Sequence, residues 1–381
     1  MTTAWIVDPI SYGGLAYYDI GLADGLARAG IGVTLVGSDR WLVRRSIDGV
    51  SYRPFFAGNR PGRGRLPRGW SYLRGLQRLI EAVSTERPSV VHWQYLELPA
   101  FDLLAMTWLA ARNVPQVYTA HELLPWRARA YHAGVFGRIY STVNRVIVHN
   151  EADRLALAER FAVEPARVEV IQHGDYRLFA TPQLPQAEAR RRLGLRADGP
   201  IALFFGNLRP SKGLDVLLEA WPEVIRRVAA AHLVVAGRPY KAGGEWRAFE
   251  RSGIPASTLT VVPEQIDPDR ANAFYRAADV VVLPYRSITT SGVLRYAYSS
   301  GRCVVATAVG EHISWVRDGE TGRLVPTADP VALAAALSEV LADRAMAETM
   351  GRAGLRFSEA WFGWSRIGQQ TADLYRQIAR G

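Results

Sequence analysis

Two stretches in the second half of the chain hold residues suited to binding phosphate. In the first, residues 279–307, the pattern predicts a buried strand, a polar turn, a helix that begins at Ser291-Gly292, and a second buried strand. The start of a helix offers backbone N–H groups and the positive end of its dipole, which favour an anion. Glycine lets the backbone approach a ligand closely, and the hydroxyl groups of Thr290 and Ser291 can hydrogen-bond phosphate oxygens. The same residues would also suit an ordinary helix N-cap.

The second stretch, residues 206–213, reads Gly-Asn-Leu-Arg-Pro-Ser-Lys-Gly and separates a predicted strand from a predicted helix. Arg209 could grip a diphosphate with its forked guanidinium group, and Lys212 could add a point charge. The chain has two lysines, so one would rarely fall in this position by chance. A basic residue near a helix start also opposes the helix dipole, so an ordinary solvent-exposed helix start is the less favoured interpretation. Together the two stretches suggest a nucleotide-sugar diphosphate as the ligand.

Two more candidates lie where predicted strands end in the first half of the chain. Gly13-Gly14 follows the first predicted strand and could lie close to a diphosphate, although a simple turn explains it almost as well. Its spacing is not Gly-x-Gly-x-x-Gly, which argues against a dinucleotide-binding dehydrogenase. His121-Glu122 follows another strand, where a histidine could hydrogen-bond a sugar hydroxyl or transfer a proton. A structural role is the default for any histidine at a strand end, and three others lie at such ends: His92, His149 and His173.

Several classes of protein are disfavoured by what the sequence lacks. There is no His-x-His, His-Glu-x-x-His or cysteine cluster, so no set of metal ligands can be recognised. No Gly-x-Ser-x-Gly motif is present, which argues against an α/β-hydrolase. The single cysteine, Cys303, lies beside an apolar strand and indicates a reducing cytoplasm rather than a disulfide framework. The N-terminus does not resemble a signal peptide, and no apolar run reaches the ~18 residues of a membrane span.

The net charge of +10 is concentrated near the N-terminus. Between Trp41 and Arg78 the only acid is Asp48, whereas nine arginines occur: Arg44, Arg45, Arg53, Arg60, Arg63, Arg65, Arg68, Arg74 and Arg78. Such a segment could attract lipid headgroups, nucleic acid or an anionic substrate. A solvated loop explains the same charges equally well, because charge runs alone are weak evidence.

Alternating strand and helix patterns predict an α/β protein with parallel sheets, and 381 residues suit two domains. Strands are predicted at 4–7, 33–36, 90–93, 116–119, 145–149 and 168–172, and then at 201–205, 233–236, 259–262, 280–283 and 304–306. Helices are predicted at 15–29, 100–111, 214–227, 270–277, 331–342 and 364–379. Residues 174–199, rich in Pro, Gln, Ala and Arg, are typical of a linker with a short helix. Ligands of such sheets bind beyond the carboxyl ends of the strands, where the candidate residues would lie.

As a set, these motifs resemble the GT-B glycosyltransferases, in particular the retaining group 1 enzymes of family 4. The similarity covers most of the chain and rests on Gly13-Gly14 and on residues 118–122, 170–174, 205–213, 234–237, 277–284, 318–322 and 357–375. It implies two Rossmann-like domains facing across a cleft. Residues 1–175 would bind the acceptor, 176–199 would be the linker, and 200–357 would bind the nucleotide sugar. Residues 358–381 would form a last helix that packs back on the first domain.

The resemblance implies transfer of a sugar from a nucleotide-diphosphate donor, most simply a UDP- or GDP-sugar, to an acceptor hydroxyl, with retention and without a cofactor or metal. By position, Arg209 and Lys212 would neutralise the diphosphate, and His121 would contact the donor sugar or orient the acceptor. The implied donor and phosphate set is Gly13, Gly14, Asn207, Gly213, Thr290, Ser291, Gly292, Val293 and Leu294. The basic segment suggests acceptor contacts at Arg60, Arg63, Arg65, Trp70 and Glu122.

This chain departs from the family pattern at specific positions. The paired glutamates that often flank the phosphate helix are Ile288 and Tyr296 here, the arginine that often follows the glycine is Asn207, and another common glutamate is Ser314. Two alternatives therefore remain, a noncatalytic nucleotide-sugar-binding protein and a sugar-nucleotide epimerase, with nucleic-acid binding ranked lower. The acceptor could be a sugar, a lipid-linked glycan or a small molecule. The expected location is the cytoplasm, with a peripheral contact to the anionic inner membrane face as an open alternative.

Overall fold

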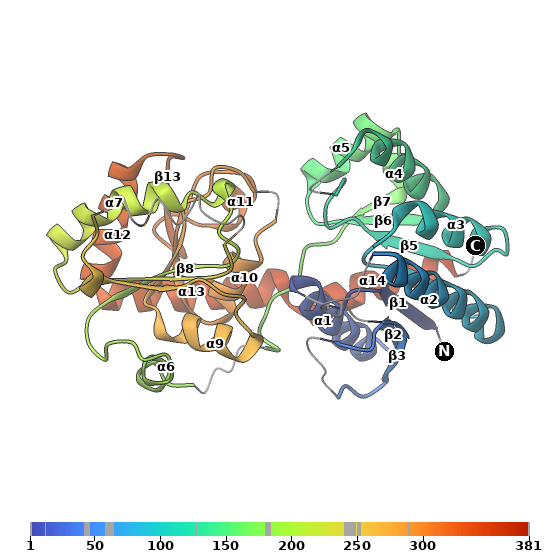
Figure 1. The fold of residues 1–381 in the computed structure, drawn as a ribbon, viewed down its shortest axis with the longest axis horizontal. Helices are drawn as coiled ribbons and strands as arrows, with labels where there is room; N and C mark the ends of the chain where they lie inside the picture. The colour runs from blue at the N-terminus through green and yellow to red at the C-terminus, as the bar shows by residue number, and fades with distance from the viewer. Residues whose placement is uncertain are drawn as a thin grey trace. The chain divides into compact units, whose positions relative to one another are not determined.

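The computed structural model describes residues 2–11, 13–41, 46–57, 65–125, 128–179, 184–239, 249, 253–288 and 290–379. The chain forms two compact units, and each is an α/β layered fold (Figure 1). The first unit contains Met1–Gly174 together with Phe362–Gly381, and the second contains Asp175–Trp361.

The first unit is built on a seven-stranded sheet in the order β3-β2-β1-β4-β5-β6-β7, in which all neighbouring strands are parallel. The strands are β1 (Thr3–Asp8), β2 (Gly32–Ser38), β3 (Val50–Phe56), β4 (Val90–Trp93), β5 (Gln116–Thr119), β6 (Arg145–Val148) and β7 (Val168–Val170). The helices are α1 (Gly14–Arg28), α2 (Arg65–Glu86), α3 (Pro99–Ala110), α4 (Ala130–Thr142), α5 (Glu151–Phe161) and α14 (Trp364–Ile378). Helices α1 and α14 pack together on one face of the sheet, and α2 to α5 cover the other (Figure 1).

The second unit has a six-stranded parallel sheet in the order β10-β9-β8-β11-β12-β13. Its strands are β8 (Ile201–Phe205), β9 (His232–Ala236), β10 (Leu259–Val262), β11 (Val280–Leu283), β12 (Cys303–Thr307) and β13 (Gly322–Val325). Its helices are α6 (Gln186–Arg192), α7 (Leu214–Arg227), α9 (Pro268–Ala277), α10 (Gly292–Ser299), α11 (His312–Trp315), α12 (Pro330–Ala342) and α13 (Arg344–Phe362). The central strands are continuous apolar runs because both faces of a parallel sheet are covered.

The predicted α/β class and parallel sheets are confirmed, and several elements were not foreseen. These are β3, β13, α2, α4, α5, α11 and α13. Strand β3 reads Val-Ser-Tyr-Arg-Pro-Phe-Phe and is largely half-exposed, so it lacks the apolar run of a central strand. It lies at the sheet edge and pairs with β2 alone. Proline has no backbone N–H to donate, and an edge strand tolerates this because one of its sides has no neighbouring strand. The end of the basic segment, residues 65–78, lies in the 22-residue helix α2. No described helix is both long enough and apolar enough to cross a membrane.

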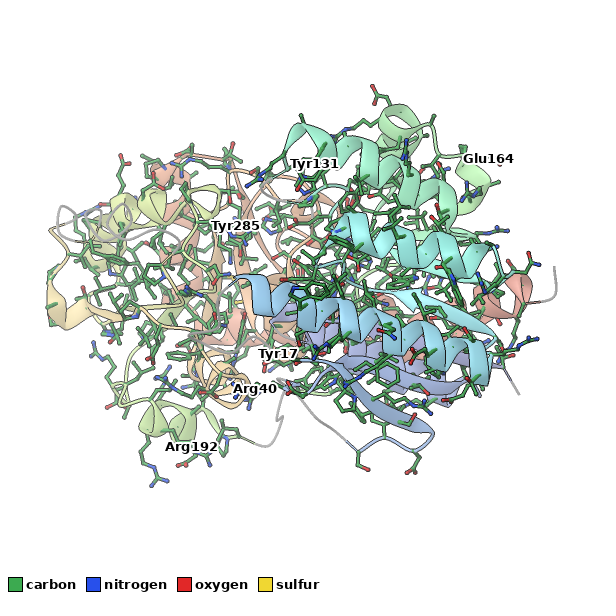
Figure 2. All side chains as sticks on the ribbon, turned by 45° about the vertical axis from the view of Figure 1, so that its right-hand side comes forward. Tyr17, Arg40, Tyr131, Glu164, Arg192 and Tyr285 are labelled. Carbon is green, nitrogen blue, oxygen red and sulfur yellow. The ribbon has the colours of Figure 1, made fainter. Side chains whose placement is uncertain are left out.

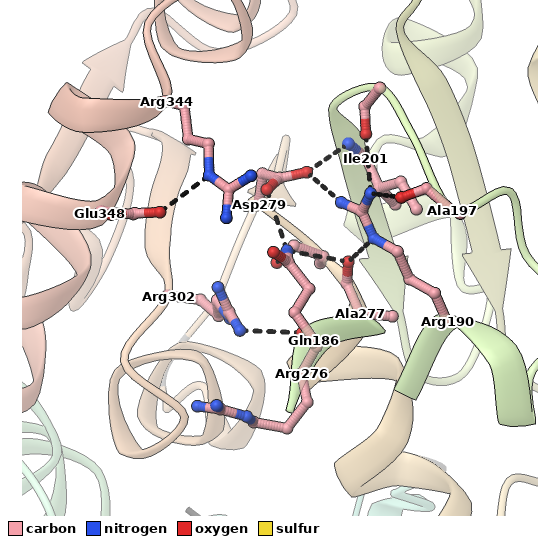
Figure 3. Close-up of polar contacts among 12 residues, drawn as sticks. Gln186, Arg190, Ala197, Ile201, Arg276, Ala277, Asp279, Arg302, Arg344 and Glu348 are labelled. Carbon is pink, nitrogen blue, oxygen red and sulfur yellow. Dashed lines mark hydrogen bonds and ion pairs between the residues drawn. The ribbon is translucent and has the colours of Figure 1, made fainter. Parts of the chain in front are cut away.

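The segment expected to be a linker is instead packed on the second unit (Figure 3). Apolar side chains of this segment and of α9 form a small core: Leu184, Ala189, Ala273 and Ala277. Arg190 donates to the carbonyl of Ala277 at 3.0 Å and forms an ion pair with Asp279 at 2.8 Å. Gln186 donates to the carbonyl of Ala278 at 3.1 Å. Polar side chains at a helix C-terminus satisfy its unpaired carbonyl groups, so α6 caps α9.

The last helix is separated from α13 by one residue, Gly363, which is the N-cap of α14. Residues 358–361, expected with the last helix, extend α13 and belong to the second unit. Helix α14 then lies on α1 in the first unit at backbone distance (Figure 1). A Cβ atom on Gly368 would lie 2.1 Å from the carbonyl carbon of Gly25, and one on Gly25 would lie 2.2 Å from the carbonyl oxygen of Trp364. Glycine at both positions therefore allows the close approach of the two helices.

Gly368→Ala is expected to lower the free energy of unfolding by about 1–3 kcal/mol, because the added methyl group would overlap the α1 backbone. The matched control is Gly134→Ala in α4, where a Cβ atom meets nothing within 4 Å. That change should stabilise the protein by about 0.5–1 kcal/mol through helix propensity alone. Urea denaturation of both variants measures the difference, and equal effects would contradict close packing of α1 and α14.

Candidate active site

The two phosphate-type stretches meet in the second unit. Strand β8 runs into a loop that starts at Gly206, and a 3₁₀ turn over Pro210–Lys212 leads through Gly213 into α7. Both glycines have positive φ, 99° and 65°. A Cβ atom on Gly206 would lie 2.6 Å from Lys212 Nζ and 3.7 Å from Cγ2 of Val293 in α10. The loop and the start of α10 therefore lie side by side, as the sequence suggested.

The amine of Lys212 packs against this loop. Its Nζ donates to the carbonyl of Phe205 at 3.2 Å and lies 5.3 Å from the ring centre of Tyr285. Burial, and to a smaller extent the charge of Arg209, lowers the pKa of Lys212 from 10.5 to about 7. An anion placed beside this amine would restore its full positive charge, because a nearby negative charge favours the protonated form.

The start of α10 has fewer available N–H groups than the sequence implied. Ser291 is the N-cap, and its Oγ accepts from the N–H of Leu294 at 3.2 Å. The N–H of Ser291 donates to the carboxylate of Glu311. The N–H groups of Gly292 and Val293 have no hydrogen-bond partner among the described residues, as expected for the first turn of a helix. An anion at this helix end would therefore meet Gly292 and Val293.

A buried ion pair, not foreseen from the sequence, holds the start of α10. Both guanidinium Nη atoms of Arg295 lie 2.9 Å from the carboxylate oxygens of Glu311. The two side chains are 0% and 4% exposed. The same carboxylate accepts from the Ser291 N–H, so the pair joins α10 to the loop after β12. An arginine inside an otherwise apolar and aromatic helix was the available signal, because a buried charge needs a partner.

Aromatic side chains fill the position where the family often has its second glutamate. The ring of Tyr296 stacks between Tyr275, at 4.3 Å, and Tyr176, at 5.1 Å. A Cβ atom on Gly292 would lie 2.7 Å from the hydroxyl of Tyr176, so glycine is needed there for space as well. The local environment of α10 is thus aromatic rather than acidic.

The remaining candidates of the second unit are placed as follows. Asn207 is exposed, and Arg209 and Thr290 are partly exposed. Arg286 was not foreseen: its Nη atoms pair with Asp215 at 2.7 and 2.6 Å, and its N–H donates to the Ser211 carbonyl at 2.7 Å. It thereby braces the loop that carries Lys212.

In the first unit, His121 follows β5 and is hydrogen-bonded on both ring nitrogens. Its Nδ1 lies 3.0 Å from Nε2 of His149, which follows β6, and its Nε2 lies 2.9 Å from Oε1 of Gln94, which follows β4. These strands are neighbours in the sheet, so their carboxyl ends bring the three side chains together. The ring of Tyr18 packs edge-on against His121 at 4.7 Å.

The predicted Gly13-Gly14 turn begins α1, with Gly13 as the N-cap at φ 69°. Next to it, the carboxylate of Asp8 accepts from the N–H of Ser11 at 2.9 Å. The carboxyl group of Asp19 is buried near that of Asp8, and neither of its oxygens has a hydrogen-bond partner among the described residues. A proton shared between the two carboxyl groups would let one donate to the other and would supply the missing partner. Burial raises the pKa of both, and Asp8 raises that of Asp19 further.

Asp19→Asn is expected to raise the free energy of unfolding at pH 8 by about 1–3 kcal/mol, because the amide supplies the hydrogen without a titrating proton. Since the folded pKa of Asp19 is raised, the contribution of the protonated pair is complete below about pH 4 and is lost as the pH rises toward the folded value. The difference in free energy of unfolding between the variant and the wild type should therefore increase in favour of the variant as the pH rises. Denaturation between pH 4 and 8 tests this, with the exposed Asp373→Asn as control; a loss at every pH would contradict the shared proton.

The predicted acceptor contacts are partly described. Arg60 and Arg63 lie outside the described residues, and Arg65 begins α2 without a described side chain. Trp70 is 67% exposed on α2, and Glu122 is exposed after β5. Among the described residues, no group of three or more His, Cys, Asp or Glu side chains is arranged to hold a metal ion. The roles of these residues stay predictions.

Comparison with known proteins agrees with this arrangement. Residues 12–174 match the family described as Glycosyltransferase Family 4, and residues 199–343 match Glycosyl transferases group 1. A D-inositol 3-phosphate glycosyltransferase of Kineococcus radiotolerans is 30% identical over 403 aligned positions, covering 97% of this chain and 91% of the relative. Another, of Kribbella flavida, is 29% identical and covers 96% and 90%.

Solved structures share the fold over the whole chain. Sucrose-phosphate synthase of Thermosynechococcus elongatus superposes with a TM-score of 0.74 at 25% identity, over 99% of both chains. The Anabaena protein HepE, solved in complex with UDP-glucose, gives 0.74 at 17% identity over 99% of this chain and all of that one. The chain belongs to the group 1, family 4 glycosyltransferases of GT-B fold, and it is an enzyme that transfers a sugar from a nucleotide-sugar donor.

Proposed function

We propose that this enzyme transfers a hexose from a UDP- or GDP-sugar to a hydroxyl group, with retention of configuration and without a metal ion. The observation that carries the proposal is the position of Lys212, whose buried amine lies at the Gly206 loop beside the start of α10. A cation and helix N–H groups at one place suit the two phosphates of a departing nucleotide. They would stabilise the charge that develops as the sugar–phosphate bond breaks, which is the work a metal ion does elsewhere.

The relatives support a narrower choice of substrates. HepE has been solved with UDP-glucose, and the curated relatives are named D-inositol 3-phosphate glycosyltransferases. We therefore expect a UDP-sugar first and a polyol or sugar acceptor. His121, held at the carboxyl end of β5, would contact the sugar, and Gly13 and Gly14 would lie near the diphosphate.

Calorimetric titration with UDP, GDP, ADP and dTDP, with NAD as control, tests the donor. Tight binding of one nucleoside diphosphate supports the proposal, whereas binding of none would favour a noncatalytic GT-B protein. Transfer from the matching nucleotide sugar in the presence of EDTA then tests metal independence. The anomeric configuration of the product, read by NMR coupling constants, tests retention; inversion would contradict it.

We also propose a peripheral contact with an anionic membrane surface, which would bring a lipid-linked acceptor to the first unit. Large apolar side chains are exposed in the first halves of α2, α3 and α4: Trp70 at 67%, Phe101 at 45%, Leu104 at 66% and Tyr131 at 56%. Tyr131 is labelled in Figure 2. Helix α3 packs against both α2 and α4, so these residues belong to adjoining surfaces. Aromatic side chains beside arginines are suited to an anionic lipid interface.

Co-sedimentation with vesicles tests this contact. Binding is expected to phosphatidylglycerol vesicles and not to pure phosphatidylcholine, and Leu104→Ser should weaken it. Val331→Ser, at a side chain 75% exposed on α12 of the second unit, is the matched control and should not. Equal binding to both kinds of vesicle, or to neither, would contradict the proposal.

A further inference from the structure

The hydrogen bonds around His149 determine which of its ring nitrogens carries a proton. Nδ1 of His149 lies 2.9 Å from the carbonyl oxygen of Ile171. A carbonyl oxygen can only accept, so Nδ1 must be protonated. In neutral His149 the other nitrogen, Nε2, then has a lone pair and can only accept.

The protonation of His149 also determines which ring nitrogen of His121 is protonated. Nε2 of His149 lies 3.0 Å from Nδ1 of His121, so the hydrogen between them belongs to His121. A neutral His121 with its proton on Nδ1 has a lone pair on Nε2. In the structure, Oε1 of Gln94 lies 2.9 Å from that atom, an arrangement that would require one additional proton on the histidine pair. A half-turn of the Gln94 amide places an N–H group there instead and completes the hydrogen bonds of the neutral pair. The same half-turn brings Oε1 toward Nε2 of His92, which now lies 3.2 Å from the amide nitrogen of Gln94.

The surroundings favour the neutral pair. His121 lies among the imidazole rings of His149 and His173, at ring-centre distances of 4.9 and 6.4 Å. Burial, and then the other histidines, lowers the pKa of His121 well below its usual value. Adding a proton to this cluster would place a charge among groups that can also become positive, with the ring of Tyr18 on one side.

We propose that His149 is a positioning residue that holds the proton of His121 on Nδ1 and leaves Nε2 of His121 as a hydrogen-bond acceptor. Nε2 then accepts from the Gln94 amide or from a sugar hydroxyl that takes the place of that amide. In this state His121 recognises a hydroxyl hydrogen and cannot donate from Nε2 to a phosphate oxygen. The role toward sugar rests on the proposed function, whereas the position of the proton does not.

NMR of the protein with ¹⁵N-labelled histidine tests the position of the proton directly, because the two ring nitrogens give different shifts in each tautomer. The wild type should show His121 protonated on Nδ1 alone, with the signal assigned by its loss in His121→Asn. His149→Leu removes the acceptor and should move the proton to Nε2. His149→Gln places an amide oxygen near the former Nε2 and should keep the proton on Nδ1.

His232→Leu is the matched control, because His232 bonds Thr260 in the second unit and should leave the His121 signals unchanged. An Nε2 proton or a doubly protonated ring in wild-type His121 would overturn the proposal whether or not the enzyme is active. If the tautomer is as stated, kcat should fall about tenfold in His149→Leu, with recovery in His149→Gln and unchanged affinity for the nucleotide. Equal kcat in both variants would overturn the role toward the sugar and leave the glycosyltransferase assignment intact.

Discussion

Lys212→Ala is expected to raise the dissociation constant for the preferred nucleoside diphosphate about 10- to 100-fold, the equivalent of ~1.5–3 kcal/mol for a hydrogen bond to a charged group. The side chain is half-buried at the Gly206 loop, so water screens its charge only in part. The fold should survive, because a lysine with a lowered pKa contributes little as a buried charge. Calorimetric titration measures the affinity, and thermal unfolding verifies the fold.

Two further variants separate charge from shape. Lys212→Met keeps the apolar stem and should lose as much affinity as Lys212→Ala, because the charge is the cause. Arg227→Ala removes an equal charge from the exposed surface of α7 and should leave the affinity unchanged. A small effect of Lys212→Ala, or an equal effect of Arg227→Ala, would contradict the phosphate role of Lys212.

The affinity for a nucleotide sugar should also depend on pH through Lys212. With a pKa of about 7 in the free enzyme, the amine is protonated below that pH in both states, and binding there is independent of pH. Above pH 7 the free amine must take up a proton to bind, so the affinity should fall by up to about tenfold per pH unit. Titrations at pH 8 in buffers of different ionisation enthalpy should show proton uptake, which Lys212→Arg should abolish.

Arg295→Met is expected to lower the free energy of unfolding of the second unit by about 3–5 kcal/mol, because it leaves the buried carboxylate of Glu311 without its cation. The double change Arg295→Met with Glu311→Leu should recover part of this loss, since two apolar side chains can replace a buried pair. Unfolding in urea measures each variant.

The matched control is Arg344→Met, which breaks an ion pair on the surface of α13 with side chains 74% and 46% exposed. Exposed pairs contribute about 0–1 kcal/mol, so this variant should remain close to the wild type. If Arg295→Met is equally mild, the carboxylate of Glu311 must be stabilised by its other contact, the Ser291 N–H.

The local pattern of apolar and polar residues was sufficient to predict most of the strands. Apolar runs such as 201–205 and 280–283 could be placed because a central parallel strand is buried on both faces and needs no partner information. Glycine and hydroxyl residues at strand ends then indicated where a phosphate could lie, and the Gly206 loop does lie beside Val293 in the first turn of α10. The half-exposed edge strand β3 was not predicted, because its apolar and polar residues alternate too weakly to indicate a strand.

Contacts between distant parts of the chain could be read only from the tertiary structure. The pairing of Arg295 with Glu311, the bonds that join Gln94, His121 and His149, and the packing of α6 on α9 all connect residues far apart in sequence. No local period encodes such partners, since they are chosen by which strand ends lie next to each other in the folded sheet. Residue types therefore indicated the chemistry at each strand end. Strand order decided which side chains meet, and so which ring nitrogen of His121 and of His149 carries the proton.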